Sequence, residues 1–301
     1  MPGIIGIYAF DEKWSMARFT YYGLLALQHR GQETCGIVTY DGKGLHRFAS
    51  EGFVDQAITP EIIEKLPGWI GIGHVGTKKF PEEQVEPVLI KEPKELAICF
   101  NGKILKLDGK EVKEPDAIAL GKALSEELSK TSDPLEAVEE LDKRLYGVYC
   151  YVALDKEGNM LVARDKTGMK PLVIGSFGFD YGVVASESCA IDVIGADYKM
   201  DINPVEAYLF TPYSIERRQF AEPKPKYCAF EYVYLARPDS IVNGIPIYEV
   251  RMRIGEILAE EGRVDADVVL GVPATAIPFA MAYANKTGIP IGMGFVSTGR
   301  A

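Results

Sequence analysis

Residues 151–165, YVALDKEGNMLVARD, decide how we expect this chain to fold. Two apolar runs flank the short polar segment Lys156-Glu157-Gly158. Apolar runs of this length that are joined by a short loop containing glycine are typical of a β-hairpin. We therefore predict two adjacent antiparallel strands in this stretch.

Similar short apolar runs, each bounded by Gly, Asp or Asn, fill the first two-thirds of the chain. One of them, TYDGKGLHRF at residues 39–48, carries Asp41-Gly42 and predicts a second hairpin. Three helices are expected to interrupt the strands, at residues 15–31, 116–130 and 133–145. Their possible N-caps are Ser15, Asp116 and Asp133. Many strands with a few helices indicate an α+β fold, in which helices cover packed sheets.

The strand pattern breaks at residues 216–240, ERRQFAEPKPKYCAFEYVYLARPDS. Its proline and charge content predicts a linker, followed by one aromatic-rich strand. The order after it is helix, strand, helix, strand, and residues 266–273, ADVVLGVP, are apolar enough for a buried parallel strand. Because only about two parallel strands are visible, this unit is either truncated or packs against another surface. We place the domain boundary so that the domains span 1–222 and 223–301.

Composition excludes several classes of protein. The chain has 301 residues, of which 47% are hydrophobic and 25% charged, and these are ordinary values for a soluble globular protein. A net charge of −10 argues against a general nucleic-acid binder or a binder of anionic membranes. The five cysteines are widely spaced and form no CxxC pair, so neither a disulfide framework nor a zinc site is indicated. We see no secretory signal or membrane span and expect a cytoplasmic protein.

Seven stretches resemble the glutamine-dependent amidophosphoribosyltransferases, the enzymes that open purine biosynthesis. In chain order they are LLALQHRGQETCGI, GHVG, FNGK, RDKTGMKPLVIG, VASESCAID, CAFEYVYLARPDS and ADVVLGVPATAIPFAMAYA. The resemblance implies a class II glutamine amidotransferase-like domain with the N-terminal nucleophile hydrolase fold, a four-layer αββα sandwich. It also implies that an incomplete α/β phosphoribosyltransferase-like unit follows.

The catalytic start of the family is altered in this sequence. In such enzymes the second residue is a cysteine whose thiolate attacks the glutamine amide, with its own α-amino group as the base. Pro2 stands at that position, so the thioester cannot form, although removal of Met1 would leave a free amine. The oxyanion hole that the resemblance implies is retained, since FNGK supplies the Asn101 side chain and the Gly102 N–H. The alternative for this pair is an ordinary Asn-Gly turn between strands.

Substrate recognition also departs from the family pattern. The family segment GHVRYST supplies an arginine for the glutamine carboxylate, but Gly76 stands here, with Lys78 and Lys79 beyond it. A lysine restores charge without the planar fork of arginine. The segment EPDAIAL keeps Asp116 but loses the flanking acid. Asp116 and His74 remain as candidate substrate contacts, and the alternative for His74, as for His29, is a hydrogen-bonded structural role.

Other family features are missing or carry no chemistry. Cys228 matches a ligand of the iron–sulfur cluster in one branch of the family, but the other ligands would lie beyond Ala301, so we expect neither a metal nor a cofactor. The phosphoribosyl diphosphate loop is absent, and Ala274 and Ala276 stand where the family has an acid and a glycine. We interpret one further matching set as a structural turn: Arg164, Asp165, Gly168, Lys170 and Pro171.

Three functions remain open from the sequence. The first is a catalytically degenerate relative that acts as a partner or regulatory subunit, either as a homo-oligomer or with a phosphoribosyltransferase-type partner chain. The second is the glutamine amidotransferase half of a split enzyme whose transferase half is a separate chain. The third is a small-molecule binding protein that reuses the glutaminase pocket. Lys78 and Lys79 would then favour an anionic ligand, unless they belong to a solvated loop.

Overall fold

The computed structural model describes residues 1–78 and 84–297. The chain divides into two compact units, Met1–Tyr227 and Cys228–Ala301. The sequence places the boundary slightly earlier, between residues 222 and 223. Unit 1 holds two large antiparallel sheets, and unit 2 holds two helices with short strands.

The first sheet of unit 1 has seven strands, and each neighbouring pair is antiparallel. Their order across the sheet is β12 (Asp197–Asp201), β10 (Val173–Phe177), β11 (Tyr181–Ala185), β1 (Gly3–Ala9), β4 (Ile70–Gly76), β2 (Thr34–Tyr40) and β3 (Leu45–Glu51). Strands β2 and β3 form the hairpin predicted from Asp41-Gly42. Strand β1 lies inside the sheet between β11 and β4, so the start of the chain is fixed on both sides.

The second sheet contains the hairpin predicted at residues 151–165, since β8 pairs with β9 in antiparallel register. The order across this sheet is β14 (Ile215–Gln219), β13 (Glu206–Phe210), β9 (Met160–Arg164), β8 (Leu145–Asp155), β6 (Leu96–Leu107) and β5 (Val88–Ile90), with β7 (Lys110–Glu111) paired to β6. The long strand β6 carries Asn101 and Gly102.

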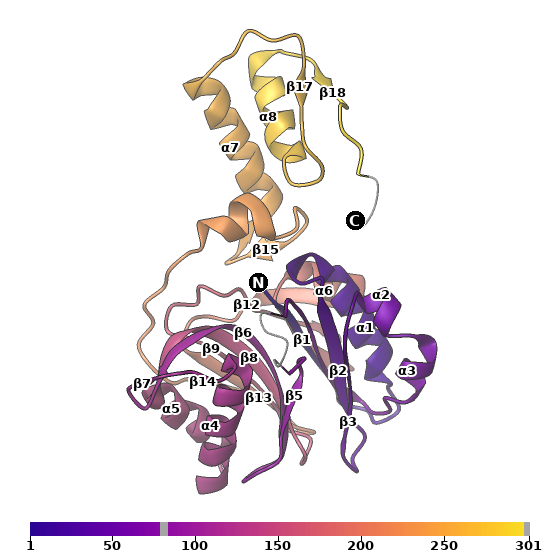
Figure 1. Cartoon of the computed structure of the whole chain (residues 1–301), viewed down its shortest axis with the longest axis vertical. Helices are drawn as coiled ribbons and strands as arrows, with labels where there is room; N and C mark the ends of the chain where they lie inside the picture. The colour runs from indigo at the N-terminus through magenta and orange to yellow at the C-terminus, as the bar shows by residue number, and fades with distance from the viewer. Residues whose placement is uncertain (79–83, 298–301) are drawn as a thin grey trace. The chain divides into compact units, whose positions relative to one another are not determined.

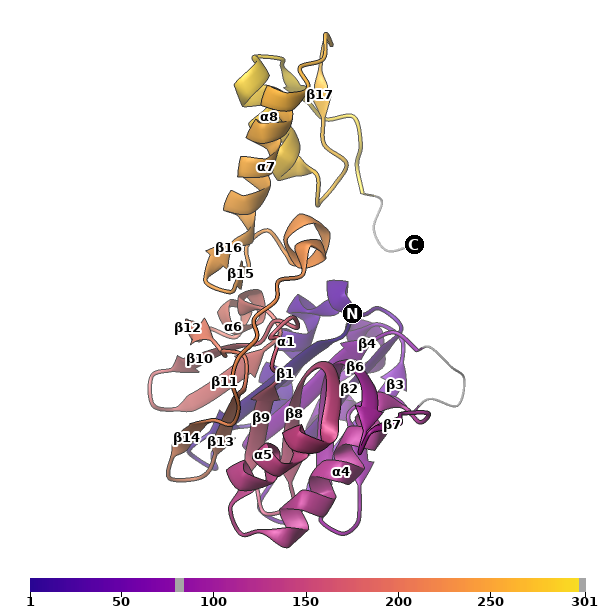
Figure 2. The ribbon, with the colours of Figure 1, turned by 90° about the vertical axis from the view of Figure 1, so that its left-hand side faces the viewer.

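The alternation of side chains along the strands builds four layers. On β1, Ile5 and Ile7 pack towards helices, whereas Ile4 and Tyr8 face the second sheet. The outer helices beside the first sheet are α1 (Met16–Ala26), α2 (Val54–Ala57), α3 (Pro60–Glu64) and α6 (Ser188–Val193). Helices α4 (Asp116–Lys130) and α5 (Pro134–Arg144) lie side by side over the outer face of the second sheet (Figures 1 and 2). The predicted αββα sandwich is confirmed.

The helix ends follow the sequence in part. Asp133 caps α5, because its side chain accepts hydrogen bonds from Leu135 N and Glu136 N. Ser15 occupies the N-cap position of α1 without a side-chain capping bond. The prediction that Asp116 caps α4 is wrong: Asp116 is the first helical residue, and its carboxylate accepts from Ile104 N of β6 instead.

Unit 2 follows the predicted order of helix, strand, helix and strand. Its elements are the π-helix η2 (Glu231–Leu235), β15 (Ile241–Val242), β16 (Ile245–Pro246), α7 (Ile247–Glu261), β17 (Val269–Leu270), α8 (Ile277–Thr287) and β18 (Ile291–Gly292). The strand predicted in the aromatic segment is wrong, because that segment is η2. The buried Arg251 of α7 donates to the carbonyl oxygens of Tyr232 at 2.9 Å and Ala236 at 2.7 Å, which stabilises the helical turn.

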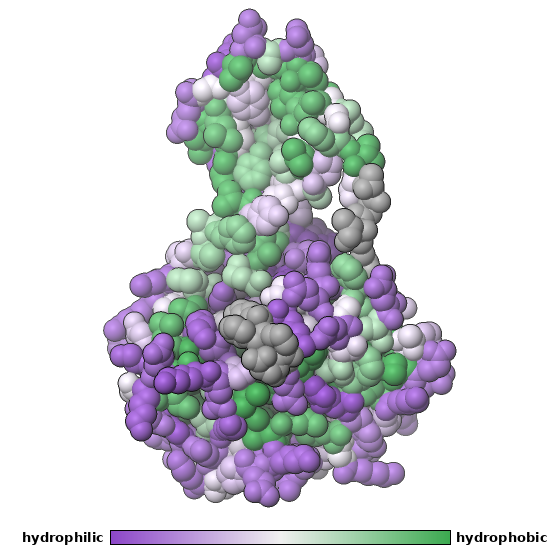
Figure 3. Space-filling view, viewed as in Figure 1, coloured by the Kyte–Doolittle hydropathy of each residue, from purple (hydrophilic) through white to green (hydrophobic). Residues whose placement is uncertain are grey.

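Strands β17 and β18 pair in parallel, but their surroundings are open. Val268, Leu270 and Val272 expose 44%, 42% and 57% of their surface, so the prediction that this strand is buried is wrong for unit 2 itself. Figure 3 shows apolar surface gathered on the visible face of this unit. The sequence of β17 therefore has the apolar residues of a buried parallel strand, but the described part of unit 2 does not bury them.

Candidate functional site

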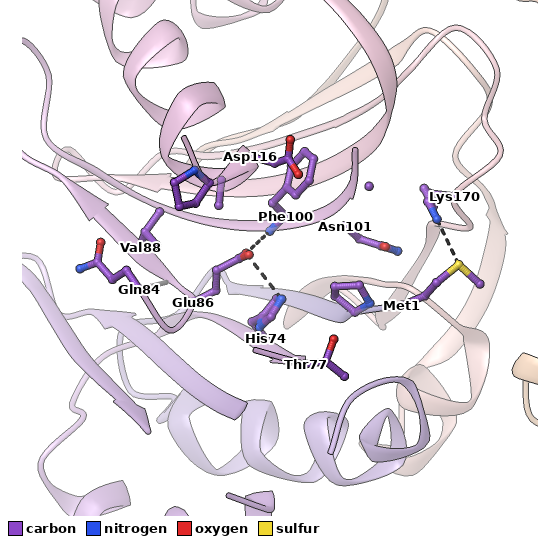
Figure 4. A pocket seen from close by; sticks show the side chains of 14 residues that line it. Met1, His74, Thr77, Gln84, Glu86, Val88, Phe100, Asn101, Asp116 and Lys170 are labelled. Carbon is purple, nitrogen blue, oxygen red and sulfur yellow. Dashed lines mark hydrogen bonds and ion pairs between the residues drawn. The ribbon is translucent and has the colours of Figure 1, made fainter. Parts of the chain in front are cut away.

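A pocket of about 240 Å³ lies in unit 1 where β1, β4 and β6 come together (Figure 4). Five of the six candidate residues from the sequence line it: Pro2, His74, Asn101, Gly102 and Asp116. Gly76, the sixth, is buried at the end of β4 and is not part of the lining. The remaining lining includes the apolar residues Val88, Phe100 and Ala117 and one lysine, Lys170.

A buried ion pair fixes the backbone at Pro2. Arg30 donates from Nε to the Pro2 carbonyl oxygen at 3.2 Å and pairs with Glu187, and both charged side chains are fully buried. His29 Nε2 lies 2.7 Å from the same Glu187 oxygen, so its predicted structural role is consistent with this contact. Sequence reasoning missed Arg30 and Glu187, although both lie inside the quoted segments LLALQHRGQETCGI and VASESCAID.

Asn101 is fully buried, and neither Oδ1 nor Nδ2 of its side chain has a hydrogen-bond partner within the described residues. A buried amide without partners costs free energy, so such a group in a pocket lining is expected to bond to water or to a bound molecule. The sequence alternative of an Asn-Gly turn is wrong, because both residues lie inside the continuous strand β6.

The alternation of a strand places the Gly102 N–H on the pocket side of β6. Tyr149, which lies opposite Gly102 on β8, uses both of its backbone groups on Asp165, so it does not bond to β6 at this point. The N–H groups of Phe100 and Ile104 lie on the same side of β6 and donate hydrogen bonds to the carboxylates of Glu86 and Asp116, respectively. Gly102 has φ +154°, and a Cβ there would collide with the carbonyl oxygen of Val148, so only glycine fits.

His74 carries a neutral imidazole. Burial, with a smaller contribution from the positive charge of the amino terminus, lowers the pKa of His74 to about 3, although the nearby Phe100 backbone acts in the opposite direction. Its Nε2 lies 3.6 Å from Glu86 Oε2, which is too long for a hydrogen bond, and at neutral pH the contact is not an ion pair. Neither ring nitrogen of His74 has a hydrogen-bond partner in the described chain. No hydrogen bond of the described residues therefore supports the alternative that His74 is a hydrogen-bonded structural residue.

His74 also occupies the space beside Gly76. A Cβ placed on Gly76 would lie 2.5 Å from His74 Cε1, closer than side chains tolerate. An arginine at position 76 would therefore need the imidazole to rotate away. The residue that the resemblance implies as a carboxylate clamp is thus absent, and the volume next to it is filled by an uncharged ring.

The other polar candidates are already paired. Both carboxylate oxygens of Asp116 lie 3.1 Å from Lys103 Nζ. Lys78 Nζ contacts Glu51 at 2.6 Å, and the Lys78 N–H donates to Glu33, so this lysine does not supply a free charge. Lys79 lies outside the described residues.

No thiol replaces the missing nucleophile in the lining of this pocket. Cys99 and Cys150 lie close to Asn101 in the sheet, but both are completely buried. Burial raises the pKa of Cys99 well above its usual value and that of Cys150 to about 12, so both stay protonated at neutral pH. Cys228 is half-buried, and the described residues contain no group of three ligands that could hold a metal. The helices of the described chain include none that is long and apolar enough to cross a membrane.

Comparison with known proteins first defines the class. Residues 78–193 match the family of glutamine amidotransferase domains. Amidophosphoribosyltransferases of Methanocaldococcus jannaschii and Methanothermobacter thermautotrophicus are 36% and 37% identical, each over 98% of this chain. The alignments cover 69% and 65% of these relatives, so the chain spans about two-thirds of their length. This chain belongs to the amidophosphoribosyltransferase family.

Solved structures agree with this assignment. A structure described as the allosteric regulatory enzyme of purine biosynthesis superposes with a TM-score of 0.87 at 32% identity, over 97% of this chain and 65% of that one. The glutamine phosphoribosylpyrophosphate amidotransferase of Bacillus subtilis, complexed with ADP and GMP, gives 0.85 at 33% identity with the same coverage. Pro2 and Gly76 nevertheless depart from the site that the family resemblance implies.

Proposed function

We propose that this chain is a catalytically degenerate member of the purine-biosynthesis family and acts as a partner or regulatory subunit. It does not hydrolyse glutamine by the route that the family resemblance implies. The observation that supports this proposal is Pro2, which lines the pocket beside Asn101 at the nucleophile position. A proline ring offers no thiolate, and the nearest thiols are protonated and enclosed by the sheet.

A partner role is favoured by the surface of unit 2. Strands β17 and β18 leave apolar side chains exposed that would form the interior of a larger parallel sheet: Val268, Leu270, Val272, Ile291 and Phe295. An apolar surface beside unpaired strand edges favours association with another chain. The partner we propose is either a second copy of this chain or a phosphoribosyltransferase-type chain.

Glutaminase activity is tested by glutamate release from L-glutamine, with the full chain at micromolar concentration. We expect no release above the buffer rate from the wild type or from Pro2→Cys, since Gly76 still leaves the glutamine carboxylate without a cation. Pro2→Cys combined with Gly76→Arg should regain hydrolysis only if the His74 ring rotates away from the new arginine. Release by the wild-type chain would overturn the proposed degeneracy, and release by Pro2→Cys alone would show that the clamp is not needed.

Association is tested by light scattering coupled to size exclusion. We expect a mass above the 33.2 kDa of one chain that falls to this value in Leu270→Lys. Tyr146→Lys, which changes an exposed apolar residue of unit 1, is the matched control and should leave the mass unchanged. A strictly monomeric wild type that also gains no mass when a phosphoribosyltransferase-type chain is added would contradict the partner role.

The second candidate is the glutamine amidotransferase half of a split enzyme, and the same open face of β17 and β18 favours it. It differs in its chemistry, because glutamate release should then appear when the separate transferase chain is added. Binding of such a chain without glutamate release supports the degenerate subunit, and binding with release supports the split enzyme.

A further inference from the structure

The pocket around Asn101 gathers polar side-chain atoms that have no protein partner among the described residues. Both nitrogens of His74 and both polar atoms of the Asn101 amide lack partners among the described residues, and both side chains are more than nine-tenths buried. The groups line one pocket of about 240 Å³. That volume corresponds to roughly eight water molecules and has room for a small organic ligand.

Lys170 brings a positive charge to the lining of this pocket. Lys170 Nζ contacts the Met1 thioether sulfur at 3.1 Å, and thioether sulfur is a weak acceptor that carries no charge. No carboxylate pairs with Lys170 in the described chain, in contrast to Lys103 and Lys78. The backbone of Lys170 is held in place because the buried Arg164 donates to its carbonyl oxygen at 2.8 Å. Lys170 belongs to the turn interpreted from the sequence as structural, and this turn therefore places a positive charge in the pocket lining (Figure 4).

We propose that this pocket binds a small carboxylate, whose oxygens accept hydrogen bonds from Asn101 Nδ2 and the Gly102 N–H and whose charge is balanced by Lys170. Both donors belong to β6, and the alternation along that strand turns the Gly102 N–H into the pocket. Val88, Phe100 and Ala117 supply an apolar lining for the carbon chain of the ligand. The neutral His74 can exchange a hydrogen bond with a polar group at the far end of that chain.

This arrangement reverses the orientation that the family resemblance implies for glutamine. There the carboxylate belongs at position 76, and the amide carbonyl belongs at Asn101 and Gly102. In this chain position 76 has no cation, whereas the free lysine stands on the side of the oxyanion donors. The lining holds two cations, Lys170 and the amino terminus of Met1, and the carboxylate of Glu86 offsets one of these charges. A monoanion therefore matches the site better than a neutral amide or a phosphate does. The inference does not depend on the proposed partner role.

The ligand class is tested by thermal unfolding of the full chain at constant ionic strength. The probes are sodium butyrate, its uncharged isostere butyramide, inorganic phosphate and L-glutamine. A ligand that binds only the folded state raises the melting temperature as its concentration passes its Kd. We expect a saturable rise with butyrate and none with the other three.

Lys170→Gln keeps the chain length close to that of lysine but removes the charge, and it should weaken butyrate binding about tenfold or more. Lys106→Gln, an exposed lysine of β6 outside the pocket, is the matched control and should bind butyrate like the wild type. Equal stabilisation by butyramide, stabilisation by phosphate at least as strong, no response to butyrate, or unchanged binding by Lys170→Gln would each overturn the proposal. Since Lys170 is only half-buried, its variant is expected to fold.

Discussion

The two units of this chain use apolar residues in opposite ways. In unit 1, both sheets are covered on both faces, and three clusters of buried side chains fill the spaces between the four layers. In unit 2, the described buried cluster is small, with Ala236, Val242 and Ile247 at its centre. The apolar side chains of β17 and β18 remain exposed there. A run of apolar residues thus predicts a strand equally well in both units, but it predicts burial only where the same chain supplies the covering layer.

The largest expected effect breaks the interior of unit 1 at its charged centre. Glu187→Ala leaves the fully buried Arg30 without its carboxylate, and removal of one partner of a buried pair costs about 3–5 kcal/mol. Urea unfolding of the variant against the wild type measures this loss. Glu216→Ala, on the exposed strand β14, should change the unfolding free energy by less than about 0.5 kcal/mol. A loss below about 1 kcal/mol for Glu187→Ala would mean that Arg30 finds another partner.

The same substitution in the two units sharpens the comparison directly. Ile72 on β4 is completely buried between the sheets, and Ile72→Ala should cost about 2–5 kcal/mol of unfolding free energy. Ile291 on β18 is 50% exposed, and Ile291→Ala should cost less than about 1 kcal/mol in the isolated chain. Similar losses at the two positions would show that β18 is covered in solution, as an assembled partner would require.

Acid should weaken unit 1 through His74, and unit 2 contains no histidine. In the unfolded chain His74 takes up a proton near pH 6.5, whereas in the folded chain it does so only near pH 3. The stability present above pH 6.5 is therefore lost progressively as the pH falls towards 3, by about 1.4 kcal/mol per pH unit. Between pH 7.5 and 5 this amounts to about 2 kcal/mol.

Unfolding free energies of the wild type and of His74→Leu at these two pH values measure this contribution. We expect His74→Leu to lose less stability on acidification than the wild type does. An acid response that is unchanged in His74→Leu would show that the folded His74 is accessible to protons.

The smallest expected effect concerns the helix ends. Asp133 caps α5 with hydrogen bonds to two backbone N–H groups, and Asp133→Ala should cost about 1 kcal/mol. Ser15→Ala, at the start of α1, should change stability by less than about 0.5 kcal/mol, because Ser15 makes no capping bond. Thermal melts of the two variants test the pair, and equal losses would show that Ser15 forms its cap in solution.

The sequence predicted the elements of the fold better than their surroundings. Apolar runs and turn residues located both hairpins, and the capping residue Asp133 located the start of α5, because these signals are local. The aromatic segment at η2 was predicted as a strand. Its helical turn is stabilised by hydrogen bonds from Arg251, which lies about twenty residues later, so the local sequence does not indicate it. Burial of β17 was predicted wrongly for a similar reason, because exposure depends on what lies next to a strand rather than on its composition.

Prediction of the candidate site depended on the family resemblance, which located Pro2, Asn101, Gly102, His74 and Asp116 around one pocket. It did not locate the supports of that pocket. Arg30 and Glu187 meet across 157 positions of sequence, and no spacing rule connects them. Lys170 was assigned to a structural turn, and Lys78 was considered as a free cation. The structure shows the opposite arrangement. Lys78 is paired with Glu51, whereas Lys170 lines the pocket and no carboxylate of the described chain pairs with it.

The alternation along β6 also gives the pocket its own spectroscopic reporter. The N–H groups of three alternate residues, Phe100, Gly102 and Ile104, lie on the same side of this strand. Those of Phe100 and Ile104 donate to the carboxylates of Glu86 and Asp116. In the empty pocket the amide proton of Gly102, which lies between them, should exchange with deuterated solvent faster than its two neighbours. A ligand that accepts its hydrogen bond should slow that exchange and leave the neighbouring amides unchanged. The protection of one glycine amide would then measure occupancy of the pocket whether or not any reaction takes place there.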